Sequence, residues 1–233
     1  MPTIKYVNKA SKRVSGVTTI INGNLGWNKG PLMHWANKVG LEGKRQHEAI
    51  KDAQDAGTLG HLLVEKDIQR ELKQKNIVIT IDEFNEEVQE MANQSFENYL
   101  VWKDAYQMKP LYTEVSMVNE KYQVGGCLDC LAKVRGEVCL VDWKTGSAVY
   151  PDHLIQGAAY IELWNHPDTS FLIEDEWITS QEFCPEKIVG GYHGLRFDKE
   201  TAGFDHKHRV DLSKSWEAFK HCLALQELKK VVK

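Results

Sequence analysis

The 233-residue sequence has no hydrophobic run close to the roughly 20 apolar residues that cross a bilayer. Its first residues, MPTIKYVNKASKRVSG, lack the apolar core of a secretory signal. The five cysteines are few, odd in number and spread over a long chain, which disfavours a disulfide framework. We therefore expect a cytoplasmic protein with no membrane partner.

Linkers and repeats are also missing. Only six prolines occur, no stretch rich in Pro, Gly or Ser divides the chain, and no internal repeat is visible. Hydrophobic residues make up 42% and charged residues 27% of the chain, a balance typical of folded domains. The sequence predicts a single domain over residues 1–233.

Charge is distributed unevenly. Residues 1–51 hold nine Lys or Arg against two Glu, and residues 206–233 hold seven basic against three acidic residues. Because the whole chain carries −4, the stretch between them is strongly acidic. Basic terminal segments on either side of an acidic central segment suggest that the protein binds a polyanion through its two terminal segments. The alternative is that these charges are solvated faces of ordinary helices.

Hydrophobic periodicity predicts both helices and strands. Residues 16–41 predict a short turn into a helix, with a second helix opening at Pro31. Further helices are expected over 45–56, 58–75, 83–107, 150–164 and 213–230, with Gly57 as an interruption and Ser213 as a cap. Strands are expected over 111–119, 122–134, 137–145, 171–183, 190–197 and 206–211, with a turn at Arg135-Gly136. This order predicts an α/β (α+β) fold with a mixed sheet flanked by helices.

The most informative stretch is GGCLDCLAKVRGEVCLVDWKT over 125–145. Asp142 and Lys144 are two apart on one strand, so their side chains share a face, and Asp129 can approach from the partner strand. A carboxylate and an ammonium at the end of an apolar strand are costly unless they are paired or used. Two converging carboxylates suit Mg²⁺ or Mn²⁺. The alternative is a plain Asp–Lys ion pair.

Further polar residues surround this stretch in the sequence. Glu114 lies on the strand before it, and Gln156 and Tyr160 share one face of the helix after it. Upstream, His61 and Glu65 share a helix face. The order Gly57-x-x-x-His61, Gly126-x-x-Asp129, Asp142-x-Lys144-Thr145 and Gln156-x-x-x-Tyr160 resembles the RecB-like branch of PD-(D/E)XK nucleases. Residues 13–41 also look like the N-terminal segment of phage-type and mitochondrial genome maintenance exonucleases.

The resemblance implies a restriction-endonuclease-like core over 55–165, preceded by a basic segment (1–50) and followed by C-terminal strands and a helix (166–233). It implies that His61, Asp129, Asp142 and the carbonyl of Trp143 bind Mg²⁺ or Mn²⁺. Lys144 would be the catalytic lysine, and Gln156 and Tyr160 would contact the scissile phosphate or the DNA backbone near it. Glu114 would hold a second ion or support the site. Some relatives carry an iron–sulfur cluster on four cysteines, but this cysteine pattern does not match, so we expect none.

Candidate DNA contacts lie in the basic N-terminal stretch. Trp27 and Trp35, among lysines such as Lys38, have the composition that stacks and tracks single strands. The alternative is that both tryptophans pack in the core. Ser15, Thr18 and Thr19 either donate to phosphates or cap the next helix. His206 and His208 are expected at the surface, and Trp164 and Trp177 in the core.

Together these features predict a metal-dependent deoxyribonuclease, an exonuclease acting on DNA ends or single strands in phage recombination or repair. The expected partners are DNA and a phage recombination or single-strand-binding protein, in a bacterial or phage-infected cell. Two alternatives stay open. One is a structure-specific endonuclease, and the other is a catalytically silent nuclease-fold module that binds DNA.

Overall fold

The computed structural model describes residues 6–27, 29–43, 45–74, 77–144, 148–197 and 204–232, without the side chains of 46–50, 52 and 53. Thr145 of the sequence motif lies outside the described residues. Within these ranges, no helix is both long and apolar enough to cross a membrane.

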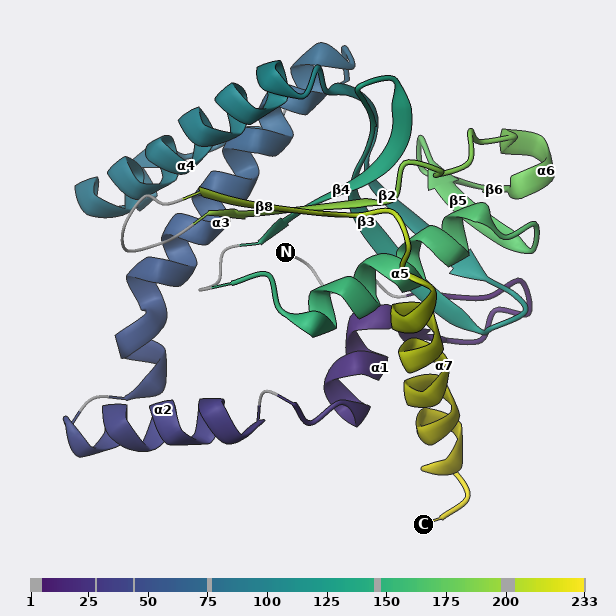
Figure 1. Cartoon of the computed structure of the whole chain (residues 1–233), viewed down its shortest axis with the longest axis horizontal. Coiled ribbons are helices and arrows are strands. Elements are labelled where there is room, and N and C mark those ends of the chain that lie inside the picture. Colours follow the sequence, from purple (N-terminus) through teal and green to yellow (C-terminus); the bar gives the residue numbers. More distant parts are fainter. Residues whose placement is uncertain are drawn as a thin grey trace.

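One eight-stranded mixed sheet forms the centre of the molecule (Figure 1). Its main path runs β6-β5-β2-β3-β4-β7-β8, and β1 pairs with β3. The β4–β7 and β1–β3 pairs are parallel, and the other pairs are antiparallel. The strands are β1 (Ser15–Gly16), β2 (Lys109–Asn119), β3 (Val124–Val134), β4 (Glu137–Lys144), β5 (Thr169–Ile173), β6 (Glu176–Thr179), β7 (Tyr192–Phe197) and β8 (Phe204–Arg209).

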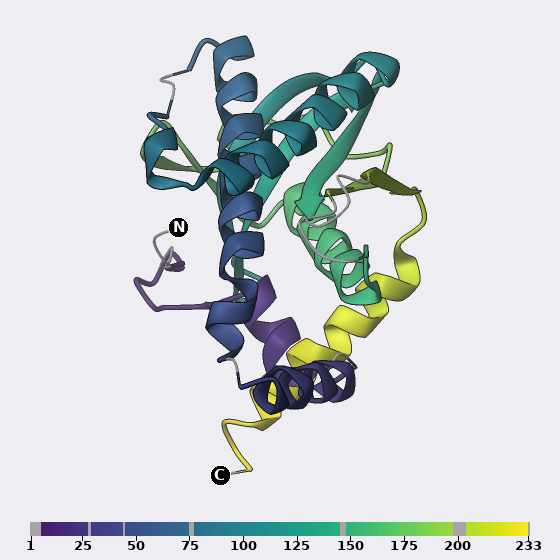
Figure 2. The same cartoon turned by 90° about the vertical axis from the view of Figure 1, so that its left-hand side faces the viewer.

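Helices cover both faces of the sheet (Figures 1 and 2). The helices are α1 (Val17–Asn24), α2 (Lys29–Leu41), α3 (Gln46–Glu71), α4 (Glu86–Ala105), α5 (Pro151–Asn165), α6 (Ser180–Phe183) and α7 (Ser213–Leu228), with a 3₁₀ turn, η1, over Ile81–Glu83. Apolar residues of α1, α5 and α7 pack in one core, and those of α3 and α4 pack in a second on the other face. The predicted α/β class, with a central mixed sheet flanked by helices, is confirmed and is consistent with a restriction-endonuclease-like core.

The β3–β4 hairpin places the chemically informative residues. Its two-residue turn is Arg135-Gly136, as predicted, and both residues have positive φ (52° and 90°). Such a turn matches the twist of the strands it joins. The apolar run Val138–Val141 is buried, with Val138 and Leu140 in one core and Cys139 and Val141 in the other. This central burial explains why β4 carries no polar residue between the exposed Glu137 at its start and Asp142.

The predicted break at Gly57 is wrong, because α3 is continuous from Gln46 to Glu71. A glycine inside a helix costs about 1 kcal/mol relative to alanine. Ala56 and Leu59, on either side of Gly57, pack against Val88 and Ala92 of α4. Burial of these side chains outweighs the cost, so tertiary packing overrides the local signal.

Four further expectations are corrected towards the C-terminus. Residues 171–183 form the β5–β6 hairpin and α6 instead of one strand, because Glu174 and Asp175 both adopt positive φ and reverse the chain. Ser213 does not cap α7, since Leu212 holds the cap position and Asp211 accepts the Ser213 N–H. Trp177 is 44% exposed on β6, whereas Trp164 is buried as expected.

The last correction concerns His206 of β8. His206 is partly buried, whereas His208 is exposed as expected. Both rings stack on His193 of β7, at centroid distances of 5.0 Å and 4.0 Å. The antiparallel β7–β8 pairing sets His193 directly opposite His208.

Candidate active site

Asp142 and Lys144 lie together at the end of β4. Lys144 Nζ donates to Asp142 at 2.7–2.8 Å, and Tyr192 of β7 donates its hydroxyl to the same carboxylate at 2.7 Å. The Asp142 side chain is 2% exposed and that of Lys144 is 15% exposed. Burial by itself would lower the pKa of Lys144, but Asp142 and Asp129 raise it above its ordinary value. Lys144 is therefore held in its charged form.

Asp129 approaches from β3, next to the position of Asp142 on β4. Its Oδ2 accepts the backbone N–H of Trp143 at 3.0 Å. Burial, followed by repulsion from Asp142, raises the Asp129 pKa well above its usual range, and Lys144 counteracts this only in part. The hairpin thus gathers more negative charge than one lysine neutralises.

Helix α5 adds an amide and a phenol to this cluster. Lys144 Nζ donates to Gln156 Oε1 at 3.0 Å, and Gln156 Nε2 donates to the hydroxyl of Tyr160 at 3.1 Å. The same Nε2 lies 3.4 Å from the Thr18 hydroxyl of α1. Gln156 and Tyr160 are one turn apart, so one helix face supplies both groups. Pro151 lies in the first turn of α5, directly after the cap residue Tyr150, and favours the start of the helix there. The helix then presents Gln156 and Tyr160 to the cluster.

Glu114 of β2 extends the acidic region. Burial, with repulsion from Glu65 of α3, raises the Glu114 pKa to about 7, and the Cys127 thiol donates to its carboxylate at 3.7 Å. Glu114 in turn contributes to raising the Asp129 pKa. Its backbone is left-handed (φ 51°), which is rare for a residue within a strand and stores strain beside the cluster. The acidic side chains therefore extend from Asp142 across the sheet towards α3.

The donor set of Asp129 and Asp142 fits a hard divalent cation. Carboxylate oxygens are the preferred ligands of Mg²⁺ and Mn²⁺, and a cation would offset the charge that raises the Asp129 pKa. His61 lies on α3, one turn before Glu65. The described residues contain no group of three His, Cys, Asp or Glu close enough to hold an ion, so His61 does not complete a ligand set with the two aspartates in this structure. Its role as a ligand, and that of the Trp143 carbonyl, stays a prediction.

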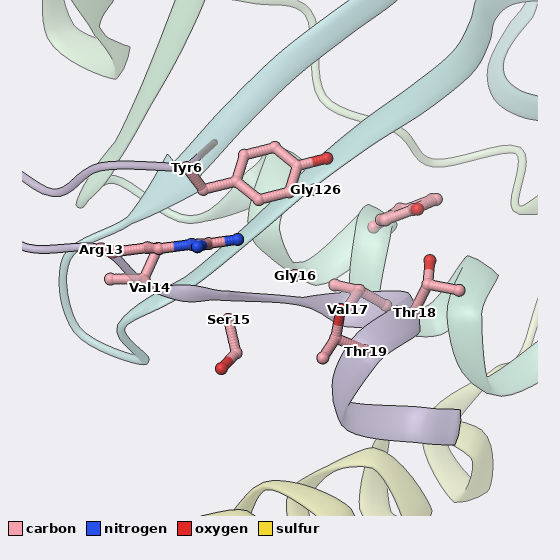
Figure 3. Close-up of a pocket in the computed structure, with 10 residues that line it drawn as sticks. Tyr6, Arg13, Val14, Ser15, Gly16, Val17, Thr18, Thr19 and Gly126 are labelled. Carbon is pink, nitrogen blue, oxygen red and sulfur yellow. The ribbon is translucent and has the colours of Figure 1, made fainter. Parts of the chain in front are cut away.

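A pocket of about 440 Å³ adjoins the cluster at Tyr160. Predicted phosphate donors Ser15, Thr18 and Thr19 line it together with Arg13 and Tyr6. Figure 3 shows the Arg13 side chain extending below the Tyr6 ring, whereas Ser15 points away from Tyr6. The pocket also lies at the start of α1, where no side chain caps the backbone N–H groups.

Two glycines of β3 make the pocket possible. A Cβ on Gly125 would lie 2.2 Å from the Tyr6 ring, and a Cβ on Gly126 would lie 2.7 Å from the Tyr160 ring. The strand therefore carries no side chain where the two rings approach it. In the Gly126-x-x-Asp129 motif, the glycine therefore makes room for the Tyr160 ring, and Asp129 of the same strand supplies a carboxylate to the cluster.

The remaining predicted DNA contacts lie apart from this pocket. Trp27 precedes α2 and is 58% exposed, while Trp35 and Lys38 lie within α2. Trp35 is partly buried, and Lys38 is exposed. None of the three lines the pocket beside Tyr160.

Sequence reasoning missed Tyr192 and Tyr6. Tyr192 is 50 residues from Asp142 in the chain and meets it only because β7 pairs with β4 in parallel. Tyr6 reaches the pocket because Val14 N donates to Tyr6 O, which holds the N-terminal segment against β1. Neither residue carries a local motif that would have marked it. Arg13 was noticed only as part of a basic stretch.

No family model matches the chain. It is similar to mitochondrial genome maintenance exonuclease 1 of Homo sapiens, with 27% identity over 143 residues, which are 59% of this chain and 34% of the human protein. The mouse protein of the same name is 36% identical over 59 residues, 23% of this chain and 18% of that protein. The aligned part thus spans about a third of the human relative.

Proposed function

We propose that this protein is a metal-dependent deoxyribonuclease of the RecB-like PD-(D/E)XK branch, acting as an exonuclease on DNA ends or single strands. One observation carries the proposal. Asp129, Asp142, Lys144 and Gln156 come from two strands and a helix into one hydrogen-bonded and charge-coupled cluster. The distant similarity to an exonuclease supports the same chemistry.

Each group in the cluster has a task in phosphodiester cleavage. Lys144 is kept protonated and held by Asp142 and Gln156, so it can orient an attacking water and stabilise charge on the phosphate. Gln156 and Tyr160 contact the phosphate from α5. Tyr192 holds Asp142 in place by its hydrogen bond. The positions are set before substrate binds, which is the main requirement of this chemistry.

Asp129 and Asp142 would hold Mg²⁺ or Mn²⁺, with the Trp143 carbonyl and His61 as further ligands and Glu114 as support or ligand of a second ion. Such an ion, when bound, binds a phosphate oxygen and lowers the pKa of the attacking water. The chain itself contributes the buried carboxylates of Asp129 and Asp142, which attract the cation. In this proposal the protein holds no iron–sulfur cluster.

DNA is the proposed partner. Ser15, Thr18 and Thr19 would donate to phosphates in the pocket beside Tyr160, because they line it together with Arg13. Trp27, Trp35 and Lys38 would contact the strand farther away, along α2. A recombination or single-strand-binding protein of a phage, in the cytoplasm of an infected bacterium, would be the cellular partner.

The test is digestion of end-labelled linear DNA, single- and double-stranded, with Mg²⁺ or Mn²⁺, by the wild type and Lys144→Ala. Removing Lys144 takes away the charge that stabilises the transition state, so we expect cleavage to fall by about 100-fold or more. Lys214→Ala is the matched control, because its side chain is 90% exposed on α7. A thermal melt of each variant establishes that it is folded.

The alternatives give different results. Cleavage of closed circular DNA as fast as linear DNA identifies an endonuclease. DNA binding without cleavage by any of the proteins identifies a silent binding module. Equal cleavage by wild type and Lys144→Ala would contradict the proposed site.

A further inference from the structure

A second groove, of about 570 Å³, adjoins the pocket beside Tyr160 at Arg13, Val14 and Ser15. It is formed by the N-terminal segment, the β2–β3 turn and the C-terminal half of α7. These three parts are far apart in the sequence. Its lining residues include Lys12, Arg13, Lys121, Tyr122, Gln226 and Lys230.

The groove is continuous with the candidate active site. Arg13, Val14 and Ser15 line both the groove and the pocket beside Tyr160. The pocket is connected in turn to the catalytic cluster, since Tyr160 bonds Gln156 and Gln156 bonds Lys144. A chain-like ligand that occupies the pocket can therefore pass Arg13 and enter the groove.

Positive charge dominates the groove. Lys12, Arg13 and Lys121 are exposed there, and no acidic side chain among the described residues forms an ion pair with any of them. The one acid in the lining, Glu227, is neutralised by Lys230 at 2.8 Å. The groove thus presents a local positive charge on a chain whose net charge is −4.

The base of the groove is apolar and partly aromatic. Val14, Ile20 and Leu223 contribute aliphatic surface. The Tyr122 ring is fixed edge-on against Trp216, at a centroid distance of 5.2 Å, and Lys121 Nζ lies 5.3 Å from the Tyr122 centroid. Cations beside an aromatic ring and aliphatic surface suit a strand with phosphates on one side and bases on the other.

We propose that this groove is a second DNA-binding site, which holds the phosphates of the substrate strand beyond Arg13, outside the catalytic pocket. The inference rests on the proposed function for its substrate class. Continuity with the pocket favours the substrate strand itself over an unrelated acidic protein. The groove explains how a chain of net negative charge can hold a polyanion close to its acidic cluster.

The experiment measures binding of single-stranded oligonucleotides of about 4 to 16 nucleotides in EDTA, which prevents cleavage. The proteins are the wild type, the double variant Lys12→Gln/Lys121→Gln and the control Lys109→Gln. Lys109 is also an exposed lysine, but it begins β2, whereas Lys121 follows the end of that strand. Affinity is measured over a salt series for each length.

We expect wild-type affinity to rise with length once the oligonucleotide reaches past Arg13. For the long oligonucleotides, the double variant should bind at least about 10-fold more weakly, and its log–log salt slope should be shallower by about 1.4, or 0.7 for each cation removed. The shortest oligonucleotides, and the control variant, should behave as wild type.

The groove proposal would be overturned if the double variant lost the same affinity for oligonucleotides of every length, or lost affinity for none of them. A wild type whose affinity is independent of length would overturn it as well, and so would binding only of an acidic peptide. The nuclease proposal fails separately. If length-dependent binding depends on Lys12 and Lys121 but no metal restores cleavage, the groove stands and the nuclease activity does not.

Discussion

At the scale of single residues, glycines decide how the tyrosines reach the polar cluster. Gly126 leaves room for Tyr160, and Gly157 of α5 leaves room for Tyr192, whose ring would lie 2.5 Å from a Cβ at that position. Both tyrosines are buried and bond groups in the cluster through their hydroxyls. Small residues in the strand and the helix therefore position larger ones beside the acids.

Gly126→Ala tests this packing. The added methyl group would collide with the buried Tyr160 ring, so we expect a loss of about 1–3 kcal/mol in the free energy of unfolding and weaker cleavage. Urea denaturation measures the first effect. Gly60→Ala is the control, because its Cβ would meet only Ser95 at 3.8 Å inside α3, and the gain in helix propensity should stabilise the protein. Equal stability changes in the two variants would contradict the packing argument.

Tyr192→Phe removes one hydrogen bond and keeps the ring. The buried Asp142 carboxylate then loses a donor, and we expect unfolding to become easier by about 1.5–3 kcal/mol. Tyr122→Phe provides the comparison, because its hydroxyl lies 3.5 Å from Glu162 in a more exposed place, and its effect should be smaller. Chemical denaturation of both variants measures the difference. A larger loss in Tyr122→Phe would show that the Tyr192 contact contributes little.

At the scale of elements, the β7–β8 pair builds a histidine stack against α4. His193 Nδ1 and His206 Nε2 are 2.8 Å apart, and Trp102 of α4 and its C-cap residue Tyr106 pack against the two rings. Burial, with the neighbouring His208, lowers the pKa of His193 to about 3 and that of His206 to about 4. Arg135 also lowers both values, whereas Asp205 raises that of His206.

This stack predicts a pH-dependent stability. Below the ordinary histidine pKa of 6.5, the unfolded chain binds protons that the folded chain does not, so the free energy of unfolding falls as the pH drops from 6.5 towards 4. For His193 alone the slope approaches about 1.4 kcal/mol per pH unit. Above pH 6.5 this contribution is constant.

Urea denaturation at pH 7.5 and pH 5 measures the effect. His193→Phe should flatten the pH dependence, because it removes the most strongly shifted group of the stack. His221→Gln, at an exposed position of α7, should leave the pH dependence unchanged. A wild type that is as stable at pH 5 as at pH 7.5 would contradict the prediction.

At the scale of the whole molecule, the central strands bury far more of their side chains than helix α2 does. Strands β3 and β4 lie in the middle of the sheet between two cores, whereas Val39 is the one buried side chain among the residues of α2. Helix α2 projects from the rest of the molecule in Figure 1 and carries exposed Leu32, Met33 and Leu41. Local opening of α2 thus loses little buried surface.

Native-state hydrogen exchange tests this difference. We expect the amides of β3 and β4 to exchange only through global unfolding and those of α2 to exchange much faster, by local opening. Binding of a single-stranded oligonucleotide should slow exchange in α2 if Trp35 and Lys38 contact the strand. Exchange from α2 as slow as from β4 would contradict the expected order.

Much of the fold is predictable because its signals are local. The β3–β4 hairpin follows from two apolar runs around Arg135-Gly136, and the shared face of Asp142 and Lys144 follows from strand periodicity. The extents of α3 and β5 are not predictable in the same way. At Gly57 the contacts with α4 outweigh a helix-breaking preference, and at Glu174-Asp175 two residues without a glycine adopt positive φ.

The sequence by itself determined the mixed α/β class, the hairpin with its two acids and lysine, and the basic N-terminal stretch, because periodicity and spacing act over a few residues. Only the tertiary structure decided that Tyr192 bonds Asp142, that Tyr6 and Arg13 line the pocket beside Tyr160, and that Lys12 and Lys121 share a groove with α7. These contacts join residues tens to hundreds of positions apart. They depend on strand order and on the packing of helices over the sheet, which no local pattern encodes.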